Sequence, residues 1–264
     1  MRLVTFDPFR TLGIPGVKYI KPELYRDHLA EIRAADWLLF PEYWQVNALI
    51  YAHRRRIFPS PAAYHLGHDK VQMTRALEAR WPQHLPATMI RPATRRDAEE
   101  ILERLGLPLV AKEVRSSEGR GVRLIGDEAE WYDYCAGRSV LYAQEYLPID
   151  RDLRVVVIGR DVVASYWRLQ PEGGFLNNVA AGGTLSFEAA PAAAVRLVER
   201  IARALRIDHA GFDVAIVGGR PYVLEFNRLF GNAGLREQGI RPAELIHRYL
   251  LARSPRKPRR PRAA

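Results

Sequence analysis

Hydrophobic and polar positions follow two different periods along the chain, and the alternation between them predicts a mixed α/β (α+β) fold. Short apolar runs and runs that alternate with polar residues favour strands, whereas apolar residues three or four positions apart favour helices. Strands are expected at Arg2–Phe6, Trp37–Phe40, 108–112, 121–125, 140–146, 153–158 and 161–169, and in a hairpin over 211–227. Helices are expected at Pro22–Ala35, Trp44–His53, Asp69–Ala79, Thr94–Leu105, Ala189–Leu205 and Arg241–Leu251.

Three polar residues interrupt the apolar runs of the predicted hairpin. Asp213 lies in the first run, and Glu225 and Asn227 lie in the second, after the turn Gly218–Pro221. Residues two apart in a strand point to the same face, so Glu225 and Asn227 are expected on one face. Oxygen ligands on adjacent strands suit a hard cation such as Mg²⁺. The same pattern also fits a half-exposed hairpin whose polar residues face solvent.

A loop of small residues follows the strand that ends in Lys112. Ser117, Gly119 and Gly121 lie in this loop, before another strand begins. The backbone N–H groups of such a loop can wrap phosphates, and glycine allows the close approach. Lys112 would add a compact positive charge. The loop is not a Walker P-loop, because no Gly-Lys-Ser/Thr opens a helix here, and an ordinary turn would explain the same residues.

The next strand runs into a linker that ends at Pro148. Glu145 and Tyr146 lie in this linker, whose backbone can be presented to a flat base. Asp152 and Arg154 then begin a further strand. A carboxylate suits ribose hydroxyls, and the planar guanidinium suits phosphate or carboxylate. The alternative for this pair is an exposed ion pair at the start of a strand.

The composition fits a chain with a sizeable buried core. At 264 residues and 48% hydrophobic, it is long enough for one large domain or two to three small ones. No apolar run is long enough to span a membrane, and no basic-then-apolar leader begins the chain, so we expect a cytoplasmic location without membrane association. The lone cysteine, Cys135, cannot form an internal disulfide, and its polar surroundings favour a bystander role.

The positive charge is concentrated at the C-terminus. The formal net charge is +10, and the segment 253–264 carries six Arg and Lys residues, no acid, and three prolines. Prolines at this spacing exclude a regular helix, so a disordered basic arm is expected. The arm either keeps the protein soluble or attracts an acidic protein, a peptide or RNA. Nucleic-acid binding through this tail is not the favoured interpretation.

Taken in order, these segments resemble the ATP-grasp superfamily, and in particular the RimK-type carboxylate–amine ligases. The resemblance covers about residues 65–250, and it rests on eight elements in the family's order rather than on any single motif. These elements are Asp69-Lys70, Val110–Lys112, Gly119–Val122, Gln144–Tyr146, Asp152–Arg154, Asn178 with Gly182-Gly183, Ala210–Asp213 and Val223–Asn227.

The resemblance implies roles for individual residues. Asp213, Glu225 and Asn227 match the family's magnesium ligands, and Arg168 falls where the family has an arginine near the acceptor and the reacting phosphoryl group. Arg154 is expected to be a second catalytic arginine. The expected nucleotide-binding residues are Lys70 and Lys112 at the phosphates, Ser117, Gly119 and Gly121 in the phosphate loop, Glu145 and Tyr146 at the adenine, and Asp152 and Asn178.

The chain departs from the family pattern at three places. Leu176 stands where an arginine of a nucleotide-contacting run is expected, so the neutralisation of the triphosphate is in question. In the phosphate loop, Glu113 and Ser116 replace a common proline and a common glycine. After Asn227, Arg228 begins a run that replaces the usual Ser/Thr-Pro-Gly. The last departure puts any inherited acceptor specificity in question.

The resemblance implies an ATP- and Mg²⁺-dependent ligase, with Mn²⁺ as an alternative ion, that forms an amide through an acyl phosphate. Its partners would be ATP, a carboxylate acceptor and an amine donor, either small molecules or a peptide or protein terminus. Two alternatives stay open: a ligase of small molecules such as D-alanine or glutathione precursors, and a non-catalytic nucleic-acid-binding protein on the same fold.

The expected domains follow from the same resemblance. A short N-terminal α/β domain would cover residues 1–68. An ATP-grasp domain would cover 69–252, with two α+β subdomains, 69–143 and 144–252, that enclose the nucleotide. The basic tail would cover 253–264.

Overall fold

The computed structural model describes residues 1–116, 121–171 and 183–254 of the chain. These residues form two compact units, one of Met1–Pro61 with the described residues from Leu235 onward, and one of the described residues between Ala62 and Gly234. The first unit thus combines both ends of the chain, and the closing helix belongs to it. No helix in the described ranges combines the length and the apolar character needed to cross a bilayer. The functions expected for domains 1–68, 69–252 and 253–264 stay predictions, and the tail 255–264 lies outside the described residues.

The first unit contains a four-stranded parallel sheet of order β2-β1-β3-β4. The aromatic ring of Tyr249, on the last helix, lies 6.5 Å from the ring of Trp37 and 5.8 Å from that of Phe58, between centroids. The strands of this sheet are β1 (Leu3–Thr5), β2 (Val17–Tyr19), β3 (Trp37–Leu39) and β4 (Ile57–Phe58). The helical segments of the first unit are α1 (Pro8–Thr11), η1 (Pro22–Leu24), α2 (Leu29–Ala34), α3 (Tyr43–Asn47), η2 (Ala48–Ala52) and α10 (Pro242–Arg253). The helix α9 (Ala233–Glu237) begins in the second unit and ends in the first.

The helix expected over Pro22–Ala35 is wrong in its extent. The chain forms the short 3₁₀ turn η1 and then the helix α2, with a break between them. His28, directly before α2, has φ −110° and ψ 19°, outside the helical region. Asp27 and His28 are poor formers of helix interiors, which explains why the apolar periodicity alone overestimated this helix.

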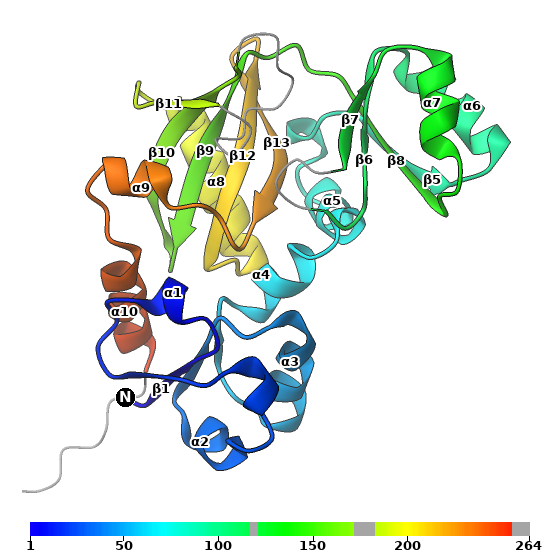
Figure 1. The fold of residues 1–264 in the computed structure, drawn as a ribbon. Helices are drawn as coiled ribbons and strands as arrows, with labels where there is room; N and C mark the ends of the chain where they lie inside the picture. The colour runs from blue at the N-terminus through cyan, green and yellow to red at the C-terminus, as the bar shows by residue number, and fades with distance from the viewer. Residues whose placement is uncertain (117–120, 172–182, 255–264) are drawn as a thin grey trace, which may run out of the picture. The chain divides into compact units, whose positions relative to one another are not determined.

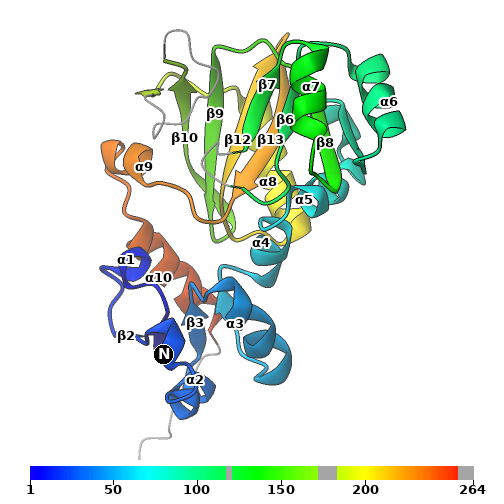
Figure 2. The same ribbon diagram turned by 45° about the vertical axis from the view of Figure 1, so that its right-hand side comes forward.

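The second unit contains two antiparallel sheets (Figure 1). The smaller sheet has the order β5-β8-β6-β7, and the helices α6 and α7 lie together on one of its faces (Figure 2). A cluster of buried residues that includes Ile101, Leu141 and Trp131 fills the space between these helices and the sheet. The smaller sheet and its two helices comprise β5 (Thr88–Pro92), α6 (Arg95–Leu105), β6 (Leu109–Lys112), β7 (Val122–Ile125), α7 (Glu128–Cys135) and β8 (Val140–Glu145).

The larger sheet has the order β11-β10-β9-β12-β13, and the helix α8 covers one of its faces. Buried apolar residues of α8, such as Leu197 and Ile201, pack with Val155 and Phe212 of the sheet. Its elements are β9 (Arg151–Ile158), β10 (Asp161–Leu169), β11 (Thr184–Ser186), α8 (Ala192–Leu205), β12 (His209–Val217) and β13 (Arg220–Asn227). The helices α4 (Pro61–Leu66) and α5 (Lys70–Glu78) and the 3₁₀ turn η3 (Pro82–His84) complete the unit.

Candidate active site on the polar face of the larger sheet

The side chains of β9 alternate between two very different environments. Leu153, Val155 and Val157 belong to the core that α8 covers, whereas Asp152 and Arg154 point to the other face. Both of these charged residues are nonetheless buried, at 5% and 8% relative exposure. Buried charges require partners, so this face of the sheet must supply them.

The partners come from the two neighbouring strands. Arg154 is paired in register with Asp213 of β12, and Asp152 is paired with Arg168 of β10. The guanidinium of Arg168 donates two hydrogen bonds, of 2.7 and 2.6 Å, to the two carboxylate oxygens of Asp152. Arg168 also lies 3.0 Å from a carboxylate oxygen of Asp213, and Arg154 Nε lies 2.6 Å from the other. The four side chains therefore form one continuous network of two acids and two arginines.

The charge of Arg168 is held by its acidic neighbours, whereas burial raises the pKa of Asp152 above its ordinary value. Burial by itself lowers the pKa of Arg168, but Asp213 and Asp152 more than offset this effect and hold the pKa above its ordinary value. Arg168 therefore stays cationic at every physiological pH.

Glu225 and Asn227 lie beside this network on β13. Asp213 and Glu225 are direct cross-strand partners, and an irregularity in the pairing follows immediately after Asp213. The Asn227 amide nitrogen donates a hydrogen bond of 2.9 Å to a Glu225 oxygen, so the two side chains lie on one face as expected. The ammonium of Lys70 lies 3.9 Å from the other Glu225 oxygen and donates to the Ser116 carbonyl oxygen at 2.8 Å.

Lys112 brings a second buried ammonium to the same region. It is 7% exposed, and its Nζ donates a hydrogen bond of 2.7 Å to Gln144 Oε1. Burial lowers the pKa of Lys112 to about 8, while the charges of Glu225 and Asp213 act in the opposite direction. A lysine with this pKa is still mostly cationic at neutral pH, and its hydrogen-bond partner is neutral.

The residues predicted to bind Mg²⁺ fit such an ion in their chemistry. Asp213, Glu225 and Asn227 offer carboxylate and amide oxygens from two adjacent strands, which are donors that hard cations prefer. Among the described residues, no group of three or more His, Cys, Asp or Glu side chains is placed to hold a metal. Their role as ligands stays a prediction.

The predicted phosphate loop is partly described. Gly121 has φ +79°, and a Cβ atom there would lie 2.7 Å from a Glu113 side-chain oxygen, so this position requires glycine. Ser117 and Gly119 lie outside the described residues, and so does Asn178.

The remaining predicted nucleotide contacts also stay predictions. Glu145 ends β8, and its side-chain oxygen accepts a hydrogen bond of 2.7 Å from the backbone N–H of Ala87, which ties the end of β8 to the residue just before β5. Tyr146 follows directly after β8. Both oxygens of Asp152 accept hydrogen bonds from Arg168, so in this structure Asp152 positions that arginine.

Two further residues of this region, Gln144 and Arg228, were given no role at the site by the sequence analysis. Gln144 bridges Lys112 and Thr88, since its amide nitrogen donates to Thr88 Oγ1 at 2.8 Å. Arg228 follows the predicted metal ligand Asn227, and its guanidinium lies 4.4 Å above the ring of Tyr64. A polar residue inside an otherwise apolar strand is a signal that could have singled out Gln144. Nothing local in the sequence indicates where the side chain of Arg228 lies.

Comparison with known protein families decides what this arrangement is. The profile of the RimK-like ATP-grasp domain matches residues 67–250. The chain belongs to the RimK-like ATP-grasp family. The resemblance inferred from the sequence is therefore confirmed, and the region that matches contains every residue of the site described above.

Solved structures confirm the ATP-grasp fold. A RimK-domain ATP-grasp protein of Sphaerobacter thermophilus superposes with a TM-score of 0.67 at 19% identity, over 82% of each chain. A D-alanine–D-alanine ligase of Bacillus anthracis superposes with a TM-score of 0.68 at 15% identity, over 89% of this chain and 84% of that one. At these identities, the likeness concerns the fold alone.

Curated relatives of this RimK-like protein carry ligase names. A probable alpha-L-glutamate ligase of Stenotrophomonas maltophilia is 35% identical over 146 residues, which are 53% of this chain and 50% of that protein. A ribosomal protein bS6–L-glutamate ligase of Escherichia fergusonii is 30% identical over 176 residues, which are 64% and 58% of the two chains. The matched region thus spans about half to three fifths of these relatives.

Proposed function

We propose that this RimK-like protein is an ATP- and Mg²⁺-dependent carboxylate–amine ligase. A carboxylate oxygen attacks the γ-phosphorus of ATP, and ADP leaves. The amine nitrogen then attacks the carbonyl carbon of the acyl phosphate, loses a proton and expels inorganic phosphate, which leaves an amide. Phosphorylation is needed because an unactivated carboxylate has no adequate leaving group at neutral pH.

One observation carries the proposal. Asp213 and Glu225 face each other across neighbouring strands, and both Lys70 and Lys112 lie close enough to Glu225 to interact with its charge. Two lysine ammonium groups beside a carboxylate pair suit a bound polyphosphate and its cation better than they suit a purely structural role. The family membership supplies ATP as the polyphosphate.

Different residues of the chain would bind the phosphates, bind Mg²⁺ and orient the reacting groups. Lys70 and Lys112 would hold phosphate oxygens and stabilise the charge that develops there. Asp213, Glu225 and Asn227 would hold Mg²⁺, and the ion would supply charge neutralisation at the same oxygens. Arg168 would place its fixed charge near the reacting groups, and the Asp152 hydrogen bonds would keep its guanidinium in one orientation.

The named relatives indicate the first substrates to test. Both relatives are named for the ligation of L-glutamate, so we propose L-glutamate as the amine. The carboxylate acceptor would be either a small acid or the C-terminus of a peptide or protein.

The experiment measures ADP release from ATP and Mg²⁺ with L-glutamate and a panel of amino acids, dipeptides and longer peptides. We expect ADP release that requires both an amine and a carboxylate, with amide product detected by mass spectrometry. In parallel, calorimetry measures Mg²⁺-dependent ADP binding by the wild type, by Glu225→Gln and by Glu103→Gln, an exposed control on α6. Glu225→Gln should lose about a hundredfold in affinity, and the control should not change.

Wild-type protein that binds ADP no better with Mg²⁺ than without it contradicts the proposal. RNA binding that weakens with salt, together with absent nucleotide binding, would favour the non-catalytic alternative.

A further inference from the structure

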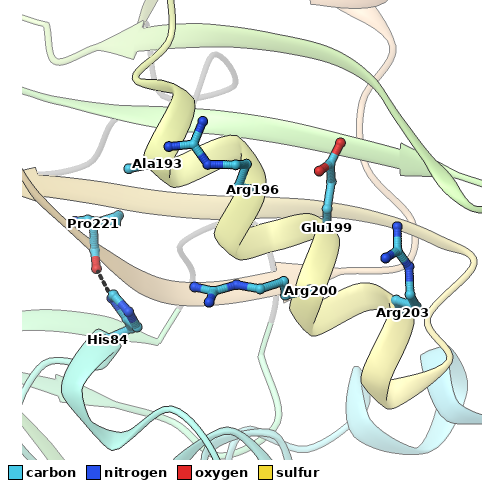
Figure 3. A pocket seen from close by; sticks show the side chains of 7 residues that line it. All are labelled: His84, Ala193, Arg196, Glu199, Arg200, Arg203 and Pro221. Carbon is cyan, nitrogen blue, oxygen red and sulfur yellow. Dashed lines mark hydrogen bonds between the residues drawn. The ribbon is translucent and has the colours of Figure 1, made fainter.

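A groove lies along the exposed side of α8, next to η3 and the start of β13 at the edge of the larger sheet. It has a volume of about 370 Å³ and is lined by α8 residues together with His84 of η3 and Pro221 of β13 (Figure 3). We call it the α8 groove. The predicted active site lies on the opposite face of the same sheet, so the groove is separate from it.

Three arginines follow one another along this side of the helix. Arg196, Arg200 and Arg203 are all exposed and line the groove. Arg196 and Arg200 both extend toward Pro221 and His84, whereas Glu199 points away from them (Figure 3). In the described part of the chain, none of the three arginines is paired with an acid.

The three arginines leave this side of the helix positively charged. Arg200 lies four residues after Arg196 and three before Arg203, at spacings where like charges repel each other, and Glu199 lies at such a spacing from Arg196 and from Arg203. Among the described residues, Glu199 is the one acid that lines the groove, so the three arginines and Glu199 together carry a net charge of +2. The exposed Arg220 adds a further positive charge close by, since its guanidinium donates to the Gln83 carbonyl oxygen at 2.5 Å.

The other wall of the groove is fixed in place. His84 Nδ1 donates a hydrogen bond of 3.0 Å to the Pro221 carbonyl oxygen, which joins η3 to the start of β13. Pro221 and Ala193 give the groove an apolar floor below the guanidinium groups. A ligand with an aliphatic stem and a charged carboxylate end would match both features.

We propose that the α8 groove binds an acidic segment of a polypeptide. The arginines from 196 to 203 span about 10 Å along the helix, which is the length of about three residues of extended chain. Arginine forks pair with carboxylates through two parallel hydrogen bonds, and the apolar floor accepts the methylene groups of glutamate side chains. In the part of the chain that the structure describes, no Phe, Tyr or Trp lines the groove, so these residues offer no aromatic platform on which nucleic-acid bases stack.

The test uses binding alone and needs no turnover, so it stands apart from the ligase proposal. A fluorescently labelled peptide of about six glutamates, long enough to cover the arginine row, is titrated with the full chain at low and at high salt. We expect saturable binding that weakens with salt. The double variant Arg196→Gln/Arg200→Gln should weaken it about tenfold or more.

The matched control removes the same charge elsewhere. Arg96→Gln/Arg160→Gln changes two exposed arginines of α6 and of the β9–β10 turn, and it should leave peptide affinity within about twofold of the wild type. All variants should keep wild-type thermal stability and Mg²⁺-dependent ADP affinity, which shows that they are folded.

Three outcomes overturn the proposal. One is no peptide binding at low salt, and another is equal loss in the control variant, which would reflect overall charge only. The third concerns a single-stranded oligonucleotide with the same charge as the peptide. If the wild type binds it more tightly than the peptide, and the groove variant binds it more weakly than the wild type does, the groove is a nucleic-acid site.

Discussion

The buried ammonium of Lys112 donates its hydrogen bond to a neutral acceptor, the side-chain oxygen of Gln144, at 2.7 Å. Gln144 is oriented for this contact by its own amide nitrogen, which donates to Thr88 Oγ1. A carboxylate at this position would have neutralised the lysine. The glutamine instead satisfies one donor of the buried ammonium without neutralising its charge.

The first prediction concerns pH. Burial lowers the pKa of Lys112 to about 8, so the free protein loses this charge as the pH rises through that value. Bound phosphate favours the charged form, and ADP affinity should therefore fall by up to about tenfold per pH unit above 8. Calorimetry between about pH 7.5 and 9.5 measures this window, in which the phosphates themselves no longer titrate. Lys112→Arg stays charged and should give a nearly flat profile; equal slopes for the two proteins would contradict this role.

Gln144→Glu tests the same relationship from the acceptor side. A carboxylate beside Lys112 would raise the pKa of the lysine and neutralise its charge. ADP affinity at pH 7.5 should fall by about tenfold, while the fall above pH 8 should move to higher pH. Glu103→Gln, on the exposed side of α6, should change neither quantity. An unchanged affinity for Gln144→Glu would mean that Lys112 does not contact the phosphates.

The network around Arg168 makes a prediction about stability. Arg168→Met leaves Asp152 buried without its two hydrogen bonds, and the free energy of unfolding should fall by about 3–5 kcal/mol. The double variant Asp152→Asn/Arg168→Met also removes the unpaired buried carboxylate and should recover part of the lost free energy of unfolding. Urea unfolding of the wild type, both single variants and the double variant closes the cycle. Strictly additive effects would show that the two side chains are not coupled.

Gly211 approaches the same network from β12. A Cβ atom here would lie 2.6 Å from Arg154 Nη1 and 2.9 Å from its Cδ, and Arg154 is held by Asp213. Gly211→Ala should therefore destabilise the protein by about 1–3 kcal/mol and displace Arg154. Gly231→Ala is the control, because a Cβ atom there has no neighbour within 4 Å. Thermal unfolding of both variants checks the difference, and equal melting temperatures would refute it.

The thiol of Cys135 should react slowly with alkylating reagents in the folded protein. Burial raises the pKa of its thiol to about 11, against the opposing charge of Arg138. At pH 7 only about one thiol in ten thousand is then a thiolate, which is the reactive form. Alkylation by iodoacetamide should be much slower in the folded protein than in urea. Equal rates would mean that the thiol is not shielded.

Local patterns in the sequence determined much of the structure. The two-residue period of β13 placed Glu225 and Asn227 on one face, and the Asn227–Glu225 hydrogen bond confirms it. Thr94 has a side chain suited to an N-cap and directly precedes the helix α6, and its hydroxyl oxygen accepts from the Asp97 backbone N–H at 3.1 Å. These features depend on bond geometry and on residues within one turn or one strand, so a single segment contains the information.

Only the tertiary structure decided which segments meet. The pairing of Asp152 with Arg168, the position of Asp213 opposite Glu225, and the Gln144 contact of Lys112 all depend on strand register. The inclusion of α10 in the same unit as β1 depends on the packing of residues from the two ends of the chain. Register and packing are set by the burial of whole faces and by loop closure over tens of residues, and no local period in the sequence encodes them.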